Sequence, residues 1–180
     1  MANKKQFIIT SITLGAIAAC SAGLIGLTNL LTRDKIAENE RNKIVSGISK
    51  IFGQYSEISE ELHIDEYNLT VDHNYLDEIY VVGDSRNDDI LGYAFRTTGS
   101  NAYGKVSLIV GFNKTDLSFK RLSIVTNEQT YASTLEDNYI NPLNKDPNKL
   151  DDVTCNATYG AKLVRDMVNQ ATEVAKEIWK

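Results

Sequence analysis

Hydrophobic and polar positions first set apart a long apolar stretch near the start of the chain. Residues 6–32 hold no charged side chain and are mostly apolar. About 20 such residues are enough to cross a bilayer as a helix. The pattern therefore predicts a transmembrane helix over residues 7–32, preceded by a short N-terminal segment, residues 1–6.

Apolar residues at positions i, i+4, i+7 and i+8 predict a stalk helix over residues 33–53, which continues from the membrane. They are Ile44, Ile48, Ile51 and Phe52. Residues 54–180 then form one domain. Its first part, residues 54–75, is polar and acidic without a clean period, and we expect a loop or a short irregular element there.

The middle of the domain is rich in strand-forming residues separated by turns. Four strands follow one another, which predicts a meander rather than a parallel sheet. The strands are residues 78–82, 90–95, 106–112 and 117–125. Turn residues join the first strand to the second and the third to the fourth, so each pair is expected to be a hairpin.

Residues 126–150 return to loop composition and contain both prolines, Pro142 and Pro147. A loop of this length inside a compact domain is usually functional. The chain then ends in an amphipathic helix. Its apolar face comprises Val164, Met167, Val168, Ala171, Val174, Ala175 and Ile178. The predicted fold class is α+β: an antiparallel sheet flanked by helices, preceded by one N-terminal transmembrane helix.

Charge around the apolar stretch predicts its orientation. Lys4 and Lys5 precede it without an acidic residue, whereas Arg33 and Lys35 follow it among acidic residues. The cleaner positive flank stays inside. We therefore expect a single-pass protein of the cell membrane, with a cytoplasmic N-terminus and an extracytoplasmic domain over residues 54–180.

A cleaved signal peptide is the alternative to an anchor. Residues 17–20 end in Cys20 and look like a lipoprotein cleavage box. Apolar residues continue past Cys20, however, whereas a cleaved lipoprotein usually becomes polar soon after its cysteine. This continuation favours an uncleaved anchor.

Composition excludes several partners. The net charge is −5, and the first 32 residues hold two lysines and no acid, so the rest is more acidic still. An acidic domain argues against nucleic acid as a partner. The two cysteines, Cys20 and Cys155, lie in the anchor and the domain and predict no disulfide. With only His63 and His73 as histidines, no metal site is expected.

Small and hydroxyl side chains crowd residues 152–162, at the entry to the last helix. Helix N-termini leave backbone N–H groups unpaired and carry positive dipole character. They therefore bind anions, above all phosphate. A hydroxyl at this position either caps the helix or is esterified by a phosphate held there. From these residues alone, a simple helix cap is the commoner outcome.

This segment resembles the flavin-attachment motif of the FMN-binding domain family. That family includes the RnfG component of the Rnf-type electron transport complex and a related component of the sodium-translocating NADH:quinone oxidoreductase. Its pattern is Asp-x-x-Ser/Thr-Gly-Ala-Thr, which Asp152, Ala157 and Thr158 match at the same spacing. Cys155 stands where Ser or Thr is usual, and Asn156 stands where Gly is usual.

Other stretches carry the same resemblance. Residues 31–39, directly after the anchor, look like the start of RnfG, and residues 92–99 and 103–111 resemble the family's strand and glycine pattern. The family's next signature is Glu-Thr-Pro-Gly-Leu-Gly. It corresponds to residues 128–133, which have lost the Pro-Gly pair.

The resemblance implies that FMN is bound covalently to Thr158 through a phosphodiester, attached by a separate flavin transferase from flavin adenine dinucleotide with a divalent metal. Redox chemistry then belongs to the cofactor. Tyr103 and Tyr131 are candidates to lie against the flavin ring, and Lys162 is a candidate to meet the phosphate. The residues predicted to bind the cofactor are Thr158, Ala157, Asn156, Cys155, Thr154, Asp152, Glu128, Thr130 and Tyr103.

By the same resemblance, the chain is an electron-transfer subunit of an Rnf-type, ion-translocating ferredoxin:NAD oxidoreductase. It is not catalytic alone, and its partners are the other membrane subunits and the lipid bilayer. Two alternatives remain. One is a stand-alone surface flavoprotein for extracellular electron transfer. The other is a cofactor-free anchored scaffold, which the changes at Asn156 and in residues 128–133 favour.

Overall fold

The computed structural model describes residues 2–87 and 89–179, so Met1 of the predicted N-terminal segment and Lys180 of the predicted domain lie outside the described residues. The chain divides into two compact units, residues 1–42 and residues 43–180. The predicted transmembrane and stalk helices form one continuous helix, α1 (Ala2–Phe52). Among the described residues, one helix (Gln6–Phe52) is long and apolar enough to span a membrane.

Four threonine side chains within the apolar part of α1 form hydrogen bonds inside the helix. The hydroxyls of four threonines each donate to the carbonyl oxygen four residues earlier, at 2.8–2.9 Å. These are Thr10, Thr13, Thr28 and Thr32. No water is available to such groups in lipid, so internal bonding is the condition for carrying them across. These four threonines meet that condition.

Within the described residues the domain is built on a five-stranded antiparallel sheet in the order β1-β2-β3-β4-β5. The strands are β1 (Ser56–Leu62), β2 (Leu76–Asp84), β3 (Ile90–Asn101), β4 (Gly104–Asn113) and β5 (Phe119–Asn127). The four predicted strands correspond to β2–β5, and the β2–β3 and β4–β5 hairpins are confirmed. The α+β class is confirmed as well.

The prediction of a loop over residues 54–75 is wrong for β1. Six residues of β1 pair with β2, with a register shift between Ile58 and Glu60. β1 is an edge strand, and its glutamates are exposed while Ile58 and Leu62 are half-buried. A solvated edge needs few apolar residues, which explains why its sequence does not look like a strand. A short 3₁₀ turn, η1 (Ile64–Glu66), follows.

The prediction of a loop over residues 126–150 is also wrong. The segment holds α2 (Ala132–Leu135), a π-helical turn η2 (Glu136–Ile140), α3 (Asn141–Lys145) and a 3₁₀ turn η3 (Pro147–Asp151). Pro142 and Pro147 lie in the first turns of α3 and η3, where a missing N–H is harmless. The apolar side chains of the segment enter the core. They are Leu135, Tyr139, Ile140 and Leu143.

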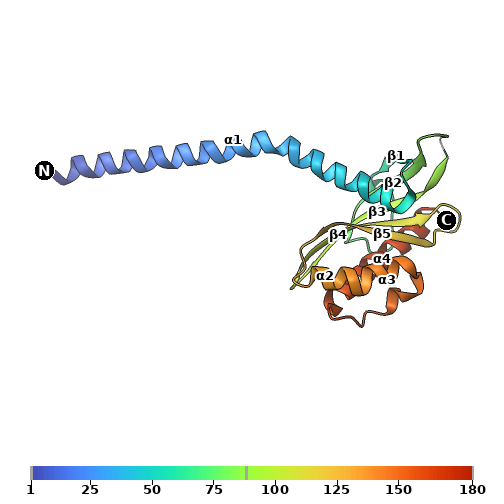
Figure 1. The fold of residues 1–180 in the computed structure, drawn as a ribbon. Coiled ribbons are helices and arrows are strands. Elements are labelled where there is room, and N and C mark those ends of the chain that lie inside the picture. The colour runs from blue at the N-terminus through green and yellow to red at the C-terminus, as the bar shows by residue number, and fades with distance from the viewer. Residues whose placement is uncertain (1, 88, 180) are drawn as a thin grey trace. The chain divides into compact units, whose positions relative to one another are not determined.

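The sheet is covered on both faces. Helix α4 (Thr158–Ile178) packs on one face together with α2 and α3, which gather on the same side in Figure 1. The opposite face meets the last turns of α1. Alternate residues of each strand serve the two faces: Ile79 and Phe95 join the α4 side, whereas Tyr80 and Ala94 join the α1 side.

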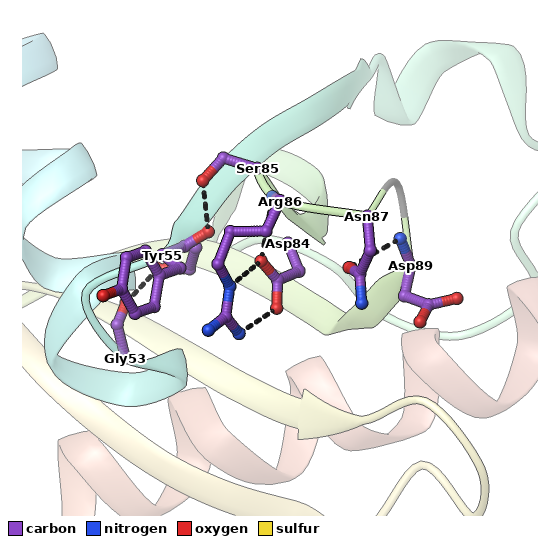
Figure 2. Close-up of polar contacts among 8 residues, drawn as sticks. Gly53, Tyr55, Asp84, Ser85, Arg86, Asn87 and Asp89 are labelled. Carbon is purple, nitrogen blue, oxygen red and sulfur yellow. Dashed lines mark hydrogen bonds and ion pairs between the residues drawn. The ribbon is translucent and has the colours of Figure 1, made fainter.

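The β2–β3 turn is fastened to the segment that follows α1 (Figure 2). Arg86 donates from Nε and Nη2 to the buried carboxylate of Asp84, at 2.9 and 2.6 Å. Its guanidinium lies 4.0 Å from the centre of the Tyr55 ring. Ser85 N donates to Tyr55 O at 2.9 Å. Hydrogen bonds from Arg86 lower the pKa of Asp84 to about 2.

The outer edge of β5 is partly closed by a side chain. Leu122 N donates to Asn144 Oδ1 at 2.8 Å, and Asn144 Nδ2 donates to Leu122 O at 3.0 Å. Asn144 lies in α3, so this pair of bonds also fixes the helical segment against the sheet.

Candidate functional site

The start of α4 places Thr158 at the first helical residue. Ala157 is the N-cap residue and offers no side-chain cap. The first backbone bond at this end runs from Ala161 N to Ala157 O at 3.0 Å. The N–H groups of Thr158, Tyr159 and Gly160 therefore have no acceptor within the helix. The simple cap weighed for Thr158 is not formed, and this helix end keeps its anion-binding character.

The hydroxyl of Thr158 is held in one direction. It donates to Cys155 O at 2.6 Å, and the side chain is half-buried. With its proton directed at the carbonyl, the oxygen lone pairs of Thr158 are left for a group approaching from outside the turn. The fixed hydroxyl is thus presented as an acceptor or a nucleophile rather than as a donor.

A cleft of about 240 Å³ lies over this helix end. Three segments meet there: the tip of the β3–β4 hairpin, the loop after β5 and the first turn of α4. We call it the α4 cleft. It is lined by Tyr103, Gln129, Tyr131, Asn156, Ala157, Thr158, Tyr159 and Gly160. Its volume is below the roughly 300–1,000 Å³ typical of pockets that enclose a whole ligand. It can hold part of a larger molecule.

Three tyrosines form the rim of the α4 cleft. Tyr103 and Tyr159 are stacked, with ring centroids 5.2 Å apart and planes at 24°. They are 39% and 63% exposed, and Tyr131 is exposed as well. Aromatic faces that remain exposed beside a cleft suit contact with a flat ligand.

Of the residues predicted to bind the cofactor, Tyr103, Asn156, Ala157 and Thr158 line the α4 cleft, as does Tyr131. The others do not line it. They are Asp152, Thr154, Cys155, Glu128 and Thr130.

Two of these residues support the hairpin beside the cleft. Thr130 contacts Tyr103 directly, because its N–H and its hydroxyl both donate to Tyr103 O, at 2.8 and 3.1 Å. Glu128 is exposed, and its N–H donates to Lys105 O at 2.8 Å. Thr130 thus supports the backbone of Tyr103 without lining the cleft. The backbone of Glu128 links its loop to β4.

The loop before Thr158 is fixed by a local hydrogen bond. The Thr154 hydroxyl donates to the Asp152 carboxylate, and this bond, with one from the Thr154 backbone, lowers the pKa of Asp152. Both side chains are exposed, as is Lys162, which does not line the cleft. Cys155 is half-buried against the core, so its small side chain fills space there.

Asn156 adopts an ordinary backbone conformation. Apart from glycines, Leu117 alone among the described residues has a positive φ. The glycine usual at position 156 in the family is therefore not demanded here by a left-handed backbone. Asn156 is exposed and adds a polar side chain to the cleft wall.

Sequence reasoning missed Gln129, Tyr159 and Gly160, which also line the α4 cleft. Tyr159 and Gly160 follow Thr158 directly, so their place at the start of a helix was a usable signal. Gln129 gave none, because a glutamine in a polar loop is ordinarily solvated. It is buried instead, with 7% of its surface exposed.

The fold and the cleft together define a class: a small α+β domain with a helix-start hydroxyl in an aromatic cleft, borne on a long apolar helix. Residues 1–48 match the family described as RnfG N-terminal region. This match covers the predicted transmembrane helix and most of the predicted stalk helix, and it supports the resemblance to RnfG that the sequence indicates. No curated protein matches the chain. The apolar helix is consistent with single-pass membrane anchoring.

Proposed function

We propose that the protein carries FMN covalently on Thr158 and passes electrons within an Rnf-type, ion-translocating ferredoxin:NAD oxidoreductase. The observation that carries the proposal is the position of the Thr158 hydroxyl. It lies at the first residue of a 21-residue helix, in a cleft with exposed tyrosine rings. A helix start suits a phosphate, and tyrosine faces suit a flat ring.

The residues of the α4 cleft fit the attachment chemistry. Cys155 O holds the hydroxyl proton, which leaves the Thr158 oxygen open to phosphorus. In the attachment reaction, a bond forms between Thr158 Oγ1 and the FMN phosphorus of flavin adenine dinucleotide. The pyrophosphate bond breaks, adenosine monophosphate leaves, and the hydroxyl proton is released. A flavin transferase with a divalent metal supplies the catalysis.

The attached flavin supplies reversible one- and two-electron chemistry. The protein's own residues would hold and orient it: the N–H groups at the start of α4 would bind the phosphate, and Tyr103, Tyr131 and Tyr159 would offer their faces to the ring. The small volume of the α4 cleft suits a carrier whose flavin must reach a partner. The match of residues 1–48 supports a place in the complex over a stand-alone flavoprotein.

The first prediction tests the attachment site. The full chain is co-expressed with a flavin transferase, and its mass is measured under denaturing conditions. Wild type is expected to be heavier by one FMN less one water, and Thr158→Ala to be unshifted. Thr172→Ala is the matched control, because it removes a hydroxyl of the same helix that donates to Val168 O at 2.7 Å and lies outside the α4 cleft. It is expected to be modified.

An unmodified wild type, with a known family member modified in parallel, would refute the covalent attachment of FMN and favour the cofactor-free scaffold. Modification that survives in Thr158→Ala would place the flavin on another residue and overturn Thr158 as the attachment site.

A further inference from the structure

Gln129 is a buried amide in the loop between β5 and α2, and its hydrogen bonds reach two other segments. Its Nε2 donates to Asn101 Oδ1 at 3.2 Å and also to Gly104 O, both at the tip of the β3–β4 hairpin. Its Oε1 faces the first turn of α4, because a Cβ added to Gly160 would lie 3.3 Å from it. Gln129 is thus placed between the hairpin tip and the helix start.

Asn101 extends this link to both stacked tyrosines. Its Oδ1 accepts from Tyr103 N at 2.8 Å, and its Nδ2 donates to Tyr159 O at 3.2 Å. One side chain therefore holds the backbones of two residues that lie far apart in sequence. Because Asn101 Oδ1 also accepts from Gln129, the buried glutamine fixes how the asparagine amide is oriented.

We propose that Gln129 and Asn101 act as a pair of positioning residues that set the separation of Tyr103 and Tyr159, and with it the contact between these rings and the flavin. This inference rests on the proposed attachment of FMN to Thr158. Neither residue needs to touch the flavin phosphate. Their effect passes through the backbones of the two tyrosines, which line the same cleft as Thr158.

Contact with a tyrosine ring quenches flavin fluorescence, since tyrosine donates an electron to the excited flavin. If the pair keeps the rings in place, its loss frees the flavin from contact without removing it. In flavinylated Gln129→Leu, the fraction of unquenched flavin is expected to rise roughly two- to tenfold, the scale of one aromatic stacking contact. Asn101→Ala is expected to do the same, and the double variant no more than either alone.

The chain provides a matched control. Gln170 lies in α4 outside the cleft and is buried to a similar extent, at 8% exposed. Its Oε1 accepts from Tyr75 N at 2.7 Å. Gln170→Leu removes the same amide and one hydrogen bond in the same domain. It is expected to lower stability and leave flavin fluorescence unchanged.

The experiment measures intact mass, flavin fluorescence and the near-ultraviolet circular dichroism of the tyrosines on the full chain co-expressed with a flavin transferase. Raised fluorescence in Gln129→Leu and Asn101→Ala, with Gln170→Leu at the wild-type level, supports the proposal. Wild-type fluorescence in the flavinylated cleft variants overturns it, and so does an equal rise in Gln170→Leu. Intact mass separates failure of the positioning role from failure of the proposed function, because an unmodified wild type overturns the flavin attachment itself. Asn101 is only half-buried, so its variant keeps the test decisive if Gln129→Leu does not fold.

Discussion

Gly104 allows the β3–β4 hairpin to approach the loop after β5 more closely than another residue would. Its φ is +132°, and a Cβ built there would lie 2.1 Å from Glu128 O. An ordinary carbon contact is about 3.5 Å or more, so Gly104→Ala must push the two segments apart. The movement would loosen two hydrogen bonds, from Glu128 N to Lys105 O and from Gln129 Nε2 to Gly104 O.

The cost of Gly104→Ala follows from these contacts. A positive φ costs a non-glycine residue about 1–2 kcal/mol, and two weakened hydrogen bonds add roughly 1–2 kcal/mol. Gly53→Ala is the matched control. Gly53 has φ +107° but nothing within 4 Å of an added Cβ, so only the conformational cost applies. We expect Gly104→Ala to lower the free energy of unfolding by about 1–2 kcal/mol more than Gly53→Ala.

Urea titration of the full chain in detergent, followed by Trp179 fluorescence, measures both variants. Trp179 is the single tryptophan of the sequence, and its ring stacks on Tyr93 with centroids 3.7 Å apart, so it reports on the domain. Equal losses in the two glycine variants would refute the close approach of the hairpin to Glu128.

Two further predictions concern the pH dependence of stability and the helical segment after β5. The pKa of Asp84 is about 2 in the folded chain, against about 3.9 unfolded, so its contribution to stability is present above pH ~4 and is lost as pH falls through about 2. Urea titrations at several pH values are expected to show this loss in wild type and a weaker one in Arg86→Met; an identical pH profile in the variant would contradict the Asp84–Arg86 pair. Leu143→Ala, at a fully buried side chain of α3, is expected to cost about 2–5 kcal/mol in the same titration, and a loss typical of a surface loop would place α3 outside the core.

Elements with long periodic patterns could be predicted from the sequence. The apolar face of α4 repeats along a 21-residue helix, and β2–β5 are strands with apolar residues facing one or both covered sides of the sheet. Helices α2 and α3 are four and five residues long, too short for a helical period to be recognised. β1 was missed for a different reason: it is an edge strand with one solvated edge, and its sequence is mostly polar.

The candidate site divides in the same way. Thr158, Ala157 and Asn156 are neighbours in sequence, so a linear motif could indicate them together. Gln129 and Asn101 are 28 residues apart, and their hydrogen bond depends on how the hairpin tip meets the loop after β5. No local pattern encodes such a contact. The motif therefore predicts the attachment point, whereas the residues that shape the cleft around it emerge only from the fold.

The amide of Asn144 has a consequence for how copies of the domain behave when they are crowded on one membrane surface. An unpaired edge strand is a template on which another chain can add a strand. At Leu122, the two bonds from Asn144 are of the kind that an added strand would make. A sixth strand would first have to displace that amide and lift α3 from the sheet. At this point the edge is closed by a single side chain, and sheet-to-sheet growth between copies is blocked there.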